Sequence, residues 1–241
     1  MMSSLLRIEG LTKSFGGVTV AKDIDFELQS GEVHCLIGPN GAGKSSLFRL
    51  VLGEHVADRG TIWFENQDIT RLRSYQRIQR GISVKFQVPG IFSELSVEQN
   101  LRIAFQNAIH RDNLENSIAE VLQFIGLETV SSLTAGSLSH GQKQWLEIGM
   151  AVGVEPRLLM LDEPTAGMSP DETFKTGEMI RELNKRGITV LAIEHDMAFV
   201  QQIAHQVTVL HFGEIFAHGS VSEIINHRGV EQIYLGTKDA L

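Results

Sequence analysis

The sequence predicts an α/β fold with one mostly parallel sheet, and three observations support this prediction. Short apolar runs of β type recur, separated by helical stretches, at residues 33–37, 158–161, 188–193 and 207–210, and this alternation is typical of a parallel sheet covered by helices. The chain of 241 residues is 42% hydrophobic and 21% charged, which suffices for one sizeable core. A glycine-rich loop joins the first run to a helical stretch. We therefore expect a single domain over residues 1–241.

Two further parts of this architecture can be read from the chain. Residues from about 5 to 30 and from 61 to 65 read as short strands separated by turn residues, and they predict an antiparallel patch beside the main sheet. Residues 171–187 begin with acidic residues, end with basic ones, carry apolar side chains on one side and stop at Gly187. This pattern predicts a helix that leads directly into the strand that follows it.

Residues 88–137 depart from the alternation of strands and helices. They carry apolar residues at helical spacing, and Ser96 and Gln99 are placed to form a capping box at the start of one helix. We expect a helical subdomain here. The α/β core would then consist of residues 1–87 and 138–241.

Charge and composition exclude several classes of protein. The formal net charge is -8 and the basic residues are scattered, so the basic surface expected of a nucleic-acid binder is missing and no nucleic-acid partner is expected. Cys35 lies within an apolar run, where a small buried hydrophobe is expected rather than a reactive thiol. No stretch approaches the ~20 apolar residues that a membrane span requires, so we expect a cytosolic protein or one peripheral to a membrane.

The glycine-rich loop has the sequence GPNGAGKS and fits the pattern G-x-x-x-x-G-K-[ST], with a strand before it and a helix after it. Glycines let successive amides point at a phosphate, and the helix start adds positive potential. Lys44 would reach the β- and γ-phosphates, and Ser45 would ligate magnesium. A chance match is the alternative, but the strand and helix on either side disfavour it. The predicted nucleotide-binding residues here are Gly38, Pro39, Asn40, Gly41, Ala42, Gly43, Lys44, Ser45 and Ser46.

Polar residues follow several of the predicted strands. Asp162 and Glu163 come directly after the run at 158–161, at the sheet edge where parallel α/β folds place ligand groups. Asp162 can hold magnesium through water and Glu163 can polarise an attacking water, although two acids here could also merely cap the next turn. His195 ends the neighbouring strand at the same edge, and Gln87 ends another short apolar run.

These motifs together resemble one family. The segments GPNGAGKS, FQ, LSHGQKQ, LLMLDEP and EHD occur in the order and spacing seen in the nucleotide-binding subunits of ABC transporters, over nearly the whole chain. The resemblance implies a P-loop NTPase of the ABC ATPase type. It also implies ATP and Mg²⁺ as ligands and ATP hydrolysis coupled to transport.

The resemblance implies a role for individual residues. Phe15 is similar to the aromatic residue that stacks on adenine, and Gln87 to the glutamine that meets magnesium or the attacking water. His195 resembles the histidine that holds the γ-phosphate and orients Glu163. The start of the signature helix would contact ATP held by the opposite subunit of a head-to-tail pair, as a phosphate-binding helix start. The residues of that contact are Ser139, His140, Gly141 and Gln142.

The chain departs from the family pattern at two positions. His140 stands where the usual signature has glycine, and Ser169 stands where the loop after DEP usually ends in aspartate. The first departure implies extra bulk beside the second ATP, and the second removes a charge that often couples the two sites. Both bear on the rate and symmetry of hydrolysis, and they leave open a module that binds ATP but barely hydrolyses it.

Further segments point to a particular group of transporters. AGMSP and the C-terminal YLG resemble the importer ATPases for branched-chain amino acids and related amides, and LSHGQKQWLEIGM, EHDMAFV, VTVLHFG and EQIYLG are most similar to the urea-import subunit. We expect an ATPase that drives import of urea or a related short amide. A branched-chain amino acid importer is the alternative, and a soluble ABC-type ATPase acting on DNA or the ribosome is an alternative of another class.

The resemblance also implies partners and a location. These are a sister ATPase subunit, in a heterodimer or in a homodimer when isolated, two permease chains and, indirectly, an extracytoplasmic solute-binding protein. A groove in residues 88–137 would receive a cytoplasmic helix of the permease. The protein would lie peripherally on the cytoplasmic face of the inner membrane.

Overall fold

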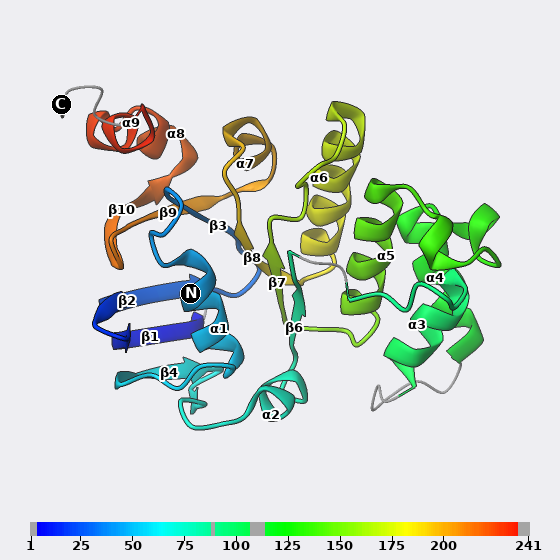
Figure 1. The fold of residues 1–241 in the computed structure, drawn as a ribbon, viewed down its shortest axis with the longest axis horizontal. Coiled ribbons are helices and arrows are strands. Elements are labelled where there is room, and N and C mark those ends of the chain that lie inside the picture. The colour runs from blue at the N-terminus through cyan, green and yellow to red at the C-terminus, as the bar shows by residue number, and fades with distance from the viewer. Residues whose placement is uncertain (1–3, 88–89, 107–113, 236–241) are drawn as a thin grey trace.

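Six strands form the central sheet of the computed structural model, in the order β10-β9-β3-β8-β7-β6 (Figure 1). Neighbouring strands are parallel except for β9 and β10, which are antiparallel. The four predicted runs all form strands of this sheet, so the prediction of a mostly parallel core is confirmed. The strands are β3 (Val33–Ile37), β6 (Ile82–Lys85), β7 (Leu158–Asp162), β8 (Thr189–Ile193), β9 (Gln206–His211) and β10 (Glu214–Ser220). The structure describes residues 4–87, 90–106 and 114–235.

A second, antiparallel sheet lies beside the first, in the order β2-β1-β4-β5, and confirms the predicted patch. Its strands are β1 (Ser4–Phe15), β2 (Val18–Gln29), β4 (Arg59–Phe64) and β5 (Gln67–Asp68). The sequence predicted several short strands in the first part, whereas β1 and β2 run for 12 residues each. Shifts in register absorb the residues that read as turns: Gly10, with φ of +55°, lies at one shift, between Ile8 and Leu11.

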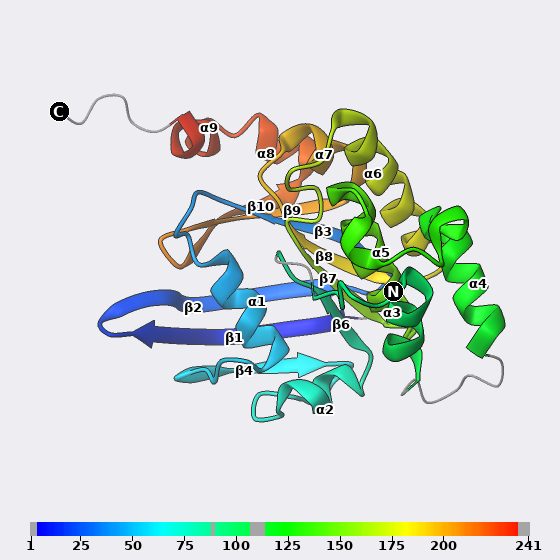
Figure 2. The same cartoon turned by 45° about the vertical axis from the view of Figure 1, so that its right-hand side comes forward.

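Helices separate and cover the two sheets (Figure 2). Helix α1 packs between them, in an apolar core that joins residues of β1, β2 and β4 to residues of β3, β7 and β8. Helices α5, α6 and α7 cover the other face of the central sheet and share a second core. The helices outside the insert are α1 (Lys44–Leu52), α2 (Ser74–Ile78), α5 (His140–Val152), α6 (Pro170–Lys185), α7 (Met197–Ile203), α8 (Val221–Ile225) and α9 (Arg228–Leu235).

The insert contains helices α3 (Val97–Phe105) and α4 (Leu114–Ile125) and two short 3₁₀ turns, Glu128–Val130 and Ala135–Ser137. The capping box predicted at Ser96 is present: its hydroxyl accepts from the Gln99 amide at 3.1 Å, and the Gln99 side chain accepts from the Ser96 amide at 2.8 Å. The insert's apolar side chains join the core formed with α5. Residues 88–89 and 107–113 lie outside the described part, and the subdomain boundary at 88–137 stays a prediction.

Two other local predictions are confirmed. The helix expected at 171–187 is α6, which Ser169 caps and which gives way to Gly187 at φ of +93°. Cys35 is fully buried, and burial raises the pKa of its thiol. Within the described residues, no helix is both long enough and apolar enough to cross a membrane.

Candidate nucleotide site

The loop between β3 and α1 requires glycine because other parts of the backbone approach it closely. A Cβ atom at Gly38 would lie 2.2 Å from the Leu210 carbonyl oxygen, and one at Gly43 would lie 2.2 Å from the Val20 carbonyl oxygen. Both glycines also have positive φ, 146° and 106°. At Gly41, by contrast, a Cβ atom would meet nothing within 4 Å, so the loop is open on that side.

The start of α1 is free to receive an anion. Its N-cap, Gly43, makes no side-chain cap bond, and no acidic residue lies in its first turn. The amides at a helix start lack partners within the helix, and among the described residues no side chain caps this start. Exposed residues Asn40 and Gly41 form the outer part of the loop, while Ala42 is buried and its amide donates to Pro39 at 3.1 Å. Ser46 lies half-buried in the first turn. This donor set fits the phosphates of ATP.

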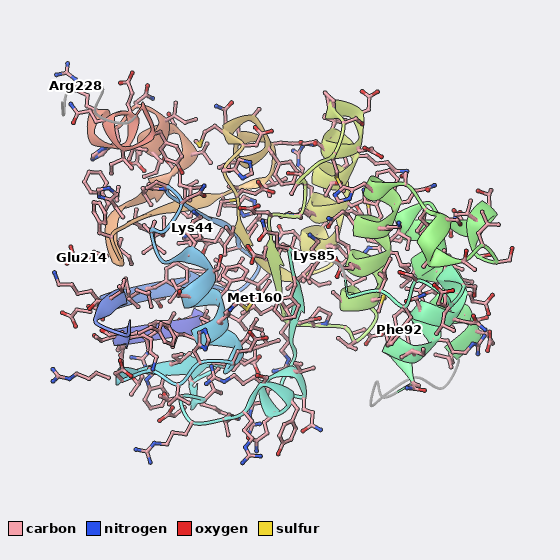
Figure 3. The ribbon with its side chains drawn as sticks, viewed as in Figure 1. Lys44, Lys85, Phe92, Met160, Glu214 and Arg228 are labelled. Atoms are coloured by element: carbon pink, nitrogen blue, oxygen red, sulfur yellow. The ribbon has the colours of Figure 1, made fainter. Side chains whose placement is uncertain are left out.

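Lys44 lies across the loop (Figure 3). Its ammonium donates to the carbonyl oxygens of Gly38, at 2.6 Å, and Pro39, at 3.0 Å, and the residue is 8% exposed. Burial lowers the pKa of Lys44, whereas the carboxylates of Glu163 and Asp162 raise it. The ammonium is therefore held at the loop by two carbonyls that phosphate oxygens can replace.

The three residues predicted to hold magnesium line one small cavity of about 170 Å³ beside α1. Ser45, Gln87 and Asp162 offer hydroxyl, amide and carboxylate oxygens, which are the hard donors that Mg²⁺ takes. Burial and the neighbouring Glu163 raise the pKa of Asp162, while nearby cations, Lys85 first, lower it. In residues 4–87, 90–106 and 114–235, no three His, Cys, Asp or Glu side chains gather as a metal site. The donor set fits an ion that also takes phosphate and water oxygens.

The structure brings the three predicted catalytic residues together at the carboxyl edge of the sheet. The Gln87 amide nitrogen donates to a carboxylate oxygen of Glu163 at 2.7 Å, and His195 Nδ1 lies 3.8 Å from the other oxygen. Glu163 has φ of +46°, which a non-glycine residue rarely adopts. Its amide donates to the Ile193 carbonyl at 3.0 Å, which helps to hold this conformation.

Phe15 lies at the end of β1, 42% exposed. Its ring meets His55 edge to face at 4.9 Å between centroids, and the Lys13 ammonium lies 5.0 Å from the ring centroid. The exposed surface leaves room for a flat ligand. Adenine stacking by Phe15 stays a prediction.

The side chains of His140 and Gln142 at the start of α5 make hydrogen bonds within their own subunit. Ser139 caps the helix by accepting from the Gln142 amide at 3.2 Å, and the Gln142 side chain accepts from the Ser139 amide at 3.0 Å. The Gln142 side chain thus completes a capping box in its own subunit. The ring of His140 bonds to the Ala166 carbonyl oxygen at 2.8 Å, so it also turns toward its own subunit. ATP contacts by the four signature residues stay predictions.

The two departures from the family pattern meet in this region. Ser169 caps α6 by accepting from the Glu172 amide at 3.3 Å, and the Glu172 side chain accepts from the Ser169 amide at 2.9 Å. The same Glu172 carboxylate lies so close to Gly141 that a Cβ atom there would be 2.3 Å from it. His140 and Ser169 therefore belong to one packed contact between the start of α5 and the loop that follows Glu163.

Sequence reasoning missed three buried charges beneath the site, namely Lys85, Glu147 and Glu194. Glu194 accepts from the Thr165 hydroxyl at 2.9 Å and from the His195 amide at 3.2 Å, and burial raises its pKa. The signal available in the sequence was a charged residue inside an apolar run, as in ISVKF and AIEHD. Such a residue is almost never fully buried unless it is paired.

A phosphate loop that opens α1, an acidic pair that ends β7 and a capped helix start at α5 define an ATP-binding cassette. The profile of the ABC transporter family matches residues 21–166. The chain belongs to this family, and it is an ATP-binding subunit whose ATP hydrolysis is coupled to transport. Subunits of this kind pair with permease subunits in a transporter complex.

Individual relatives resemble the chain over almost its whole length. The high-affinity branched-chain amino acid transport ATP-binding protein LivG of Escherichia coli is 34% identical, over 98% of this chain and 99% of its own. The lipopolysaccharide export system ATP-binding protein LptB of Acidithiobacillus ferridurans is 33% identical, over 98% of both chains. Among solved structures, the ADP conformation of an ATP-binding cassette of an ABC transporter superposes with a TM-score of 0.88 at 30% identity, covering 97% of this chain and 99% of that one.

Proposed function

We propose that this chain is the ATPase subunit of an importer for branched-chain amino acids, peripheral to the cytoplasmic face of the membrane. The observation that supports this most directly is the 34% identity to LivG over 98% of the chain. The AGMSP loop and the YLG segment, which resemble this importer group, point the same way. The similar identity to LptB, 33%, indicates that ATPases of this type serve different cargo. Urea, the narrower prediction from the sequence, appears in neither of these relatives' names and stands second.

Each residue of the site has a separate role in the proposed hydrolysis of ATP. When bound, ATP and Mg²⁺ supply the transferable phosphoryl group and neutralise part of its charge. The phosphate loop would bind the phosphates with its amides and Lys44, and Ser45, Gln87 and Asp162 would hold the metal. Glu163 accepts the proton of the attacking water, because its carboxylate is the basic group that Gln87 holds at 2.7 Å. His195, whose side chain is largely exposed and lies 3.8 Å from that carboxylate, would orient it and contact the terminal phosphate.

A complete site requires a second ATPase subunit. Helix α1 packs on one face of the central sheet and α5 on the other, so the phosphate loop and the start of α5 belong to opposite faces of the same chain. We propose that the start of α5, with Ser139 as its cap, contacts ATP bound to the partner subunit. In the native complex that partner is a different ATPase chain, and closure of the pair on ATP moves the permease subunits.

Purification from native membranes, followed by uptake assays, tests the proposed cargo. The tagged protein is drawn from membranes in mild detergent and its partners are identified by mass, and uptake of labelled leucine and labelled urea is then compared between wild-type and Glu163→Gln cells. We expect two permease chains and a second ATPase, and loss of leucine uptake alone. Loss of urea uptake alone would establish the second candidate, and recovery of only nucleic-acid-bound partners would refute both.

A further inference from the structure

Lys85 is a buried cation directly behind the acidic pair. It is the last residue of β6, 1% exposed, and it lies between β7 and α5 in Figure 3. Its ammonium lies 3.4 Å from the carbonyl oxygens of both Asp162 and Glu163. Burial lowers the pKa of Lys85, and the surrounding carboxylates, Glu147 first, raise it. A lysine in such a place needs compensating charges, and these surround it.

Glu147 is the first of those compensating charges. It belongs to α5, two turns beyond the signature residues, and is 7% exposed. One of its carboxylate oxygens accepts from the Gly90 amide at 2.5 Å, while the other is buried and has no hydrogen-bond partner among the described residues. Burial raises the pKa of Glu147, and the Gly90 amide and the charge of Lys85 lower it. The unpartnered oxygen is therefore offset by the charge of Lys85, without a hydrogen bond.

The two residues contact two of the segments that set the position of Glu163. Lys85 precedes Gln87 by two residues and reaches across to the turn at 162–163, and Glu147 holds the backbone at Gly90. Gln87 in turn donates to the Glu163 carboxylate at 2.7 Å. The side chain of Glu163 is thus held by Gln87, and its backbone by Lys85.

The backbone of Glu163 needs such support. At φ of +46° the residue occupies a conformation that costs energy for any side chain other than glycine. Only neighbouring contacts can keep it there. The Ile193 carbonyl holds the amide side of the residue at 3.0 Å, and the Lys85 ammonium holds the carbonyl side.

We propose that Lys85 is a positioning residue for Glu163: its ammonium holds the backbone of the catalytic turn at 162–163, and the buried carboxylate of Glu147 on the signature helix α5 compensates its charge. The inference rests on the catalytic role proposed for Glu163. Lys85 touches no reacting atom. It keeps the turn at 162–163 in the conformation that directs the carboxylate toward Gln87, while Glu147 supplies the opposite charge from α5.

Substitutions that separate charge from geometry test this role. Lys85→Met keeps much of the volume but removes the donor, and we expect kcat to fall by about 10- to 100-fold because the carboxylate is misplaced. Affinity for a fluorescent ATP analogue should stay within about twofold, because the phosphate loop is untouched. Lys85→Arg, which keeps the charge and the donors, should recover most of the turnover. Lys185→Met, at a lysine whose side chain is 75% exposed, is the matched control and should change nothing.

A double variant distinguishes positioning from simple stabilisation. Lys85→Met alone leaves the Glu147 carboxylate buried without its counter-charge. The concentration of urea, used here as a denaturant, at which half of the protein unfolds should therefore fall. Adding Glu147→Gln keeps an acceptor for Gly90 and removes that charge, so the midpoint should recover while kcat stays low. Recovery of kcat together with stability in the double variant would overturn the proposal, as would an unchanged kcat in Lys85→Met. If Lys85→Met does not fold, the double variant alone decides.

Comparison of Lys85→Met with Glu163→Gln distinguishes failure of the positioning role from failure of the proposed mechanism. If Glu163→Gln leaves turnover unchanged, the catalytic role of Glu163 fails and the positioning role fails with it. If Glu163→Gln abolishes turnover and Lys85→Met does not lower it, only the positioning role fails.

Discussion

Glu163 combines an unfavourable backbone conformation with a side chain held from two sides. Gln87 donates to its carboxylate at 2.7 Å, and His195 lies 3.8 Å from it. A carboxylate that receives a hydrogen bond from an amide stays oriented without losing its capacity to accept a proton. The geometry is therefore suited to a general base.

Glu163→Gln should lower the rate of ATP hydrolysis by about 100- to 10,000-fold, the range of a lost general base. Glutamine has nearly the same shape, so nucleotide affinity should be unchanged. Phosphate release and binding of a fluorescent ATP analogue measure the two quantities. Asp196→Asn, which alters an exposed acid that caps α7, serves as control. Turnover in Glu163→Gln equal to the wild-type rate would mean that the chain binds ATP without using this base.

Lys44→Ala should weaken ATP binding by about 100-fold, since the charged hydrogen bonds to phosphate are lost. The ammonium now donates to two loop carbonyls, at 2.6 and 3.0 Å, which the phosphates would replace. Titration calorimetry measures the affinity. Lys22→Ala, at an exposed lysine paired with Glu214, is the control. An unaltered affinity in Lys44→Ala would contradict the role of the loop.

Helix α5 makes contacts relevant to the site at its start and near its middle. Its start is closed by the Ser139 and Gln142 capping box and is tied to the loop after Glu163 through His140. Further along, Glu147 holds Gly90. A rigid helix with these two attachments can pass a displacement at the signature residues to the turn that carries Glu163.

Ser139→Arg should leave ATP binding intact but abolish ATP-driven pairing of subunits. The new side chain would occupy the face proposed to contact the partner's ATP, and the lost cap should lower stability by about 1 kcal/mol. Pairing is measured as the molar mass from light scattering in the presence of ATP, with each substitution made in a protein that also carries Glu163→Gln. Ser137→Arg, two residues earlier and exposed, is the control. A dimer that persists in Ser139→Arg would count against the cross-subunit contact.

Two apolar cores, one on each face of the central sheet, hold the whole molecule together. His34 lies in β3 with 0% exposure and connects this sheet to polar neighbours. Its Nδ1 donates to Glu32 at 2.8 Å, and its Nε2 lies 2.8 Å from the Thr208 hydroxyl, which also contacts His218 at 3.0 Å. Burial lowers the pKa of His34, the Glu32 carboxylate raises it, and His218 lowers it.

The lowered pKa of His34 predicts that stability falls in acid. The unfolded chain binds a proton at His34 below a pH of about 6.5, whereas the folded protein does so only at lower pH. This stabilisation is therefore present above about pH 6.5 and is lost as the pH falls. The thermal unfolding midpoint should therefore fall as the pH is lowered from about 7.5 to about 5.5.

Thermal unfolding of His34→Gln tests this contribution. Glutamine can donate to Glu32 and contact Thr208 without titrating, so the midpoint should depend less steeply on pH than in the wild-type protein. His211→Gln, at a partly exposed histidine, should keep the wild-type slope. If the unfolding midpoint depends on pH equally steeply in the wild-type protein and in His34→Gln, then His34 does not cause the loss of stability in acid.

Local patterns in the sequence were enough to predict most strands, the phosphate loop, the capped helices and the family. Ser96 and Gln99 are three residues apart, and the glycines of the loop lie between one strand and one helix, so neighbours in sequence decide these features. The alternation of apolar runs and helices likewise predicted the mostly parallel core. Within each element, the spacing of apolar residues along the sequence reflects which side chains are buried.

The tertiary structure alone decided how distant residues meet. Gln87, Glu163 and His195 end three different strands, and only the order β8-β7-β6 in the sheet brings them to one point. The length of the β1 and β2 pair and the burial of Lys85 and Glu147 also could not be predicted from the sequence. The physical reason is that strand order, register and charge burial depend on contacts between segments far apart in the chain, whereas turns, caps and periodicity depend on a few neighbouring residues.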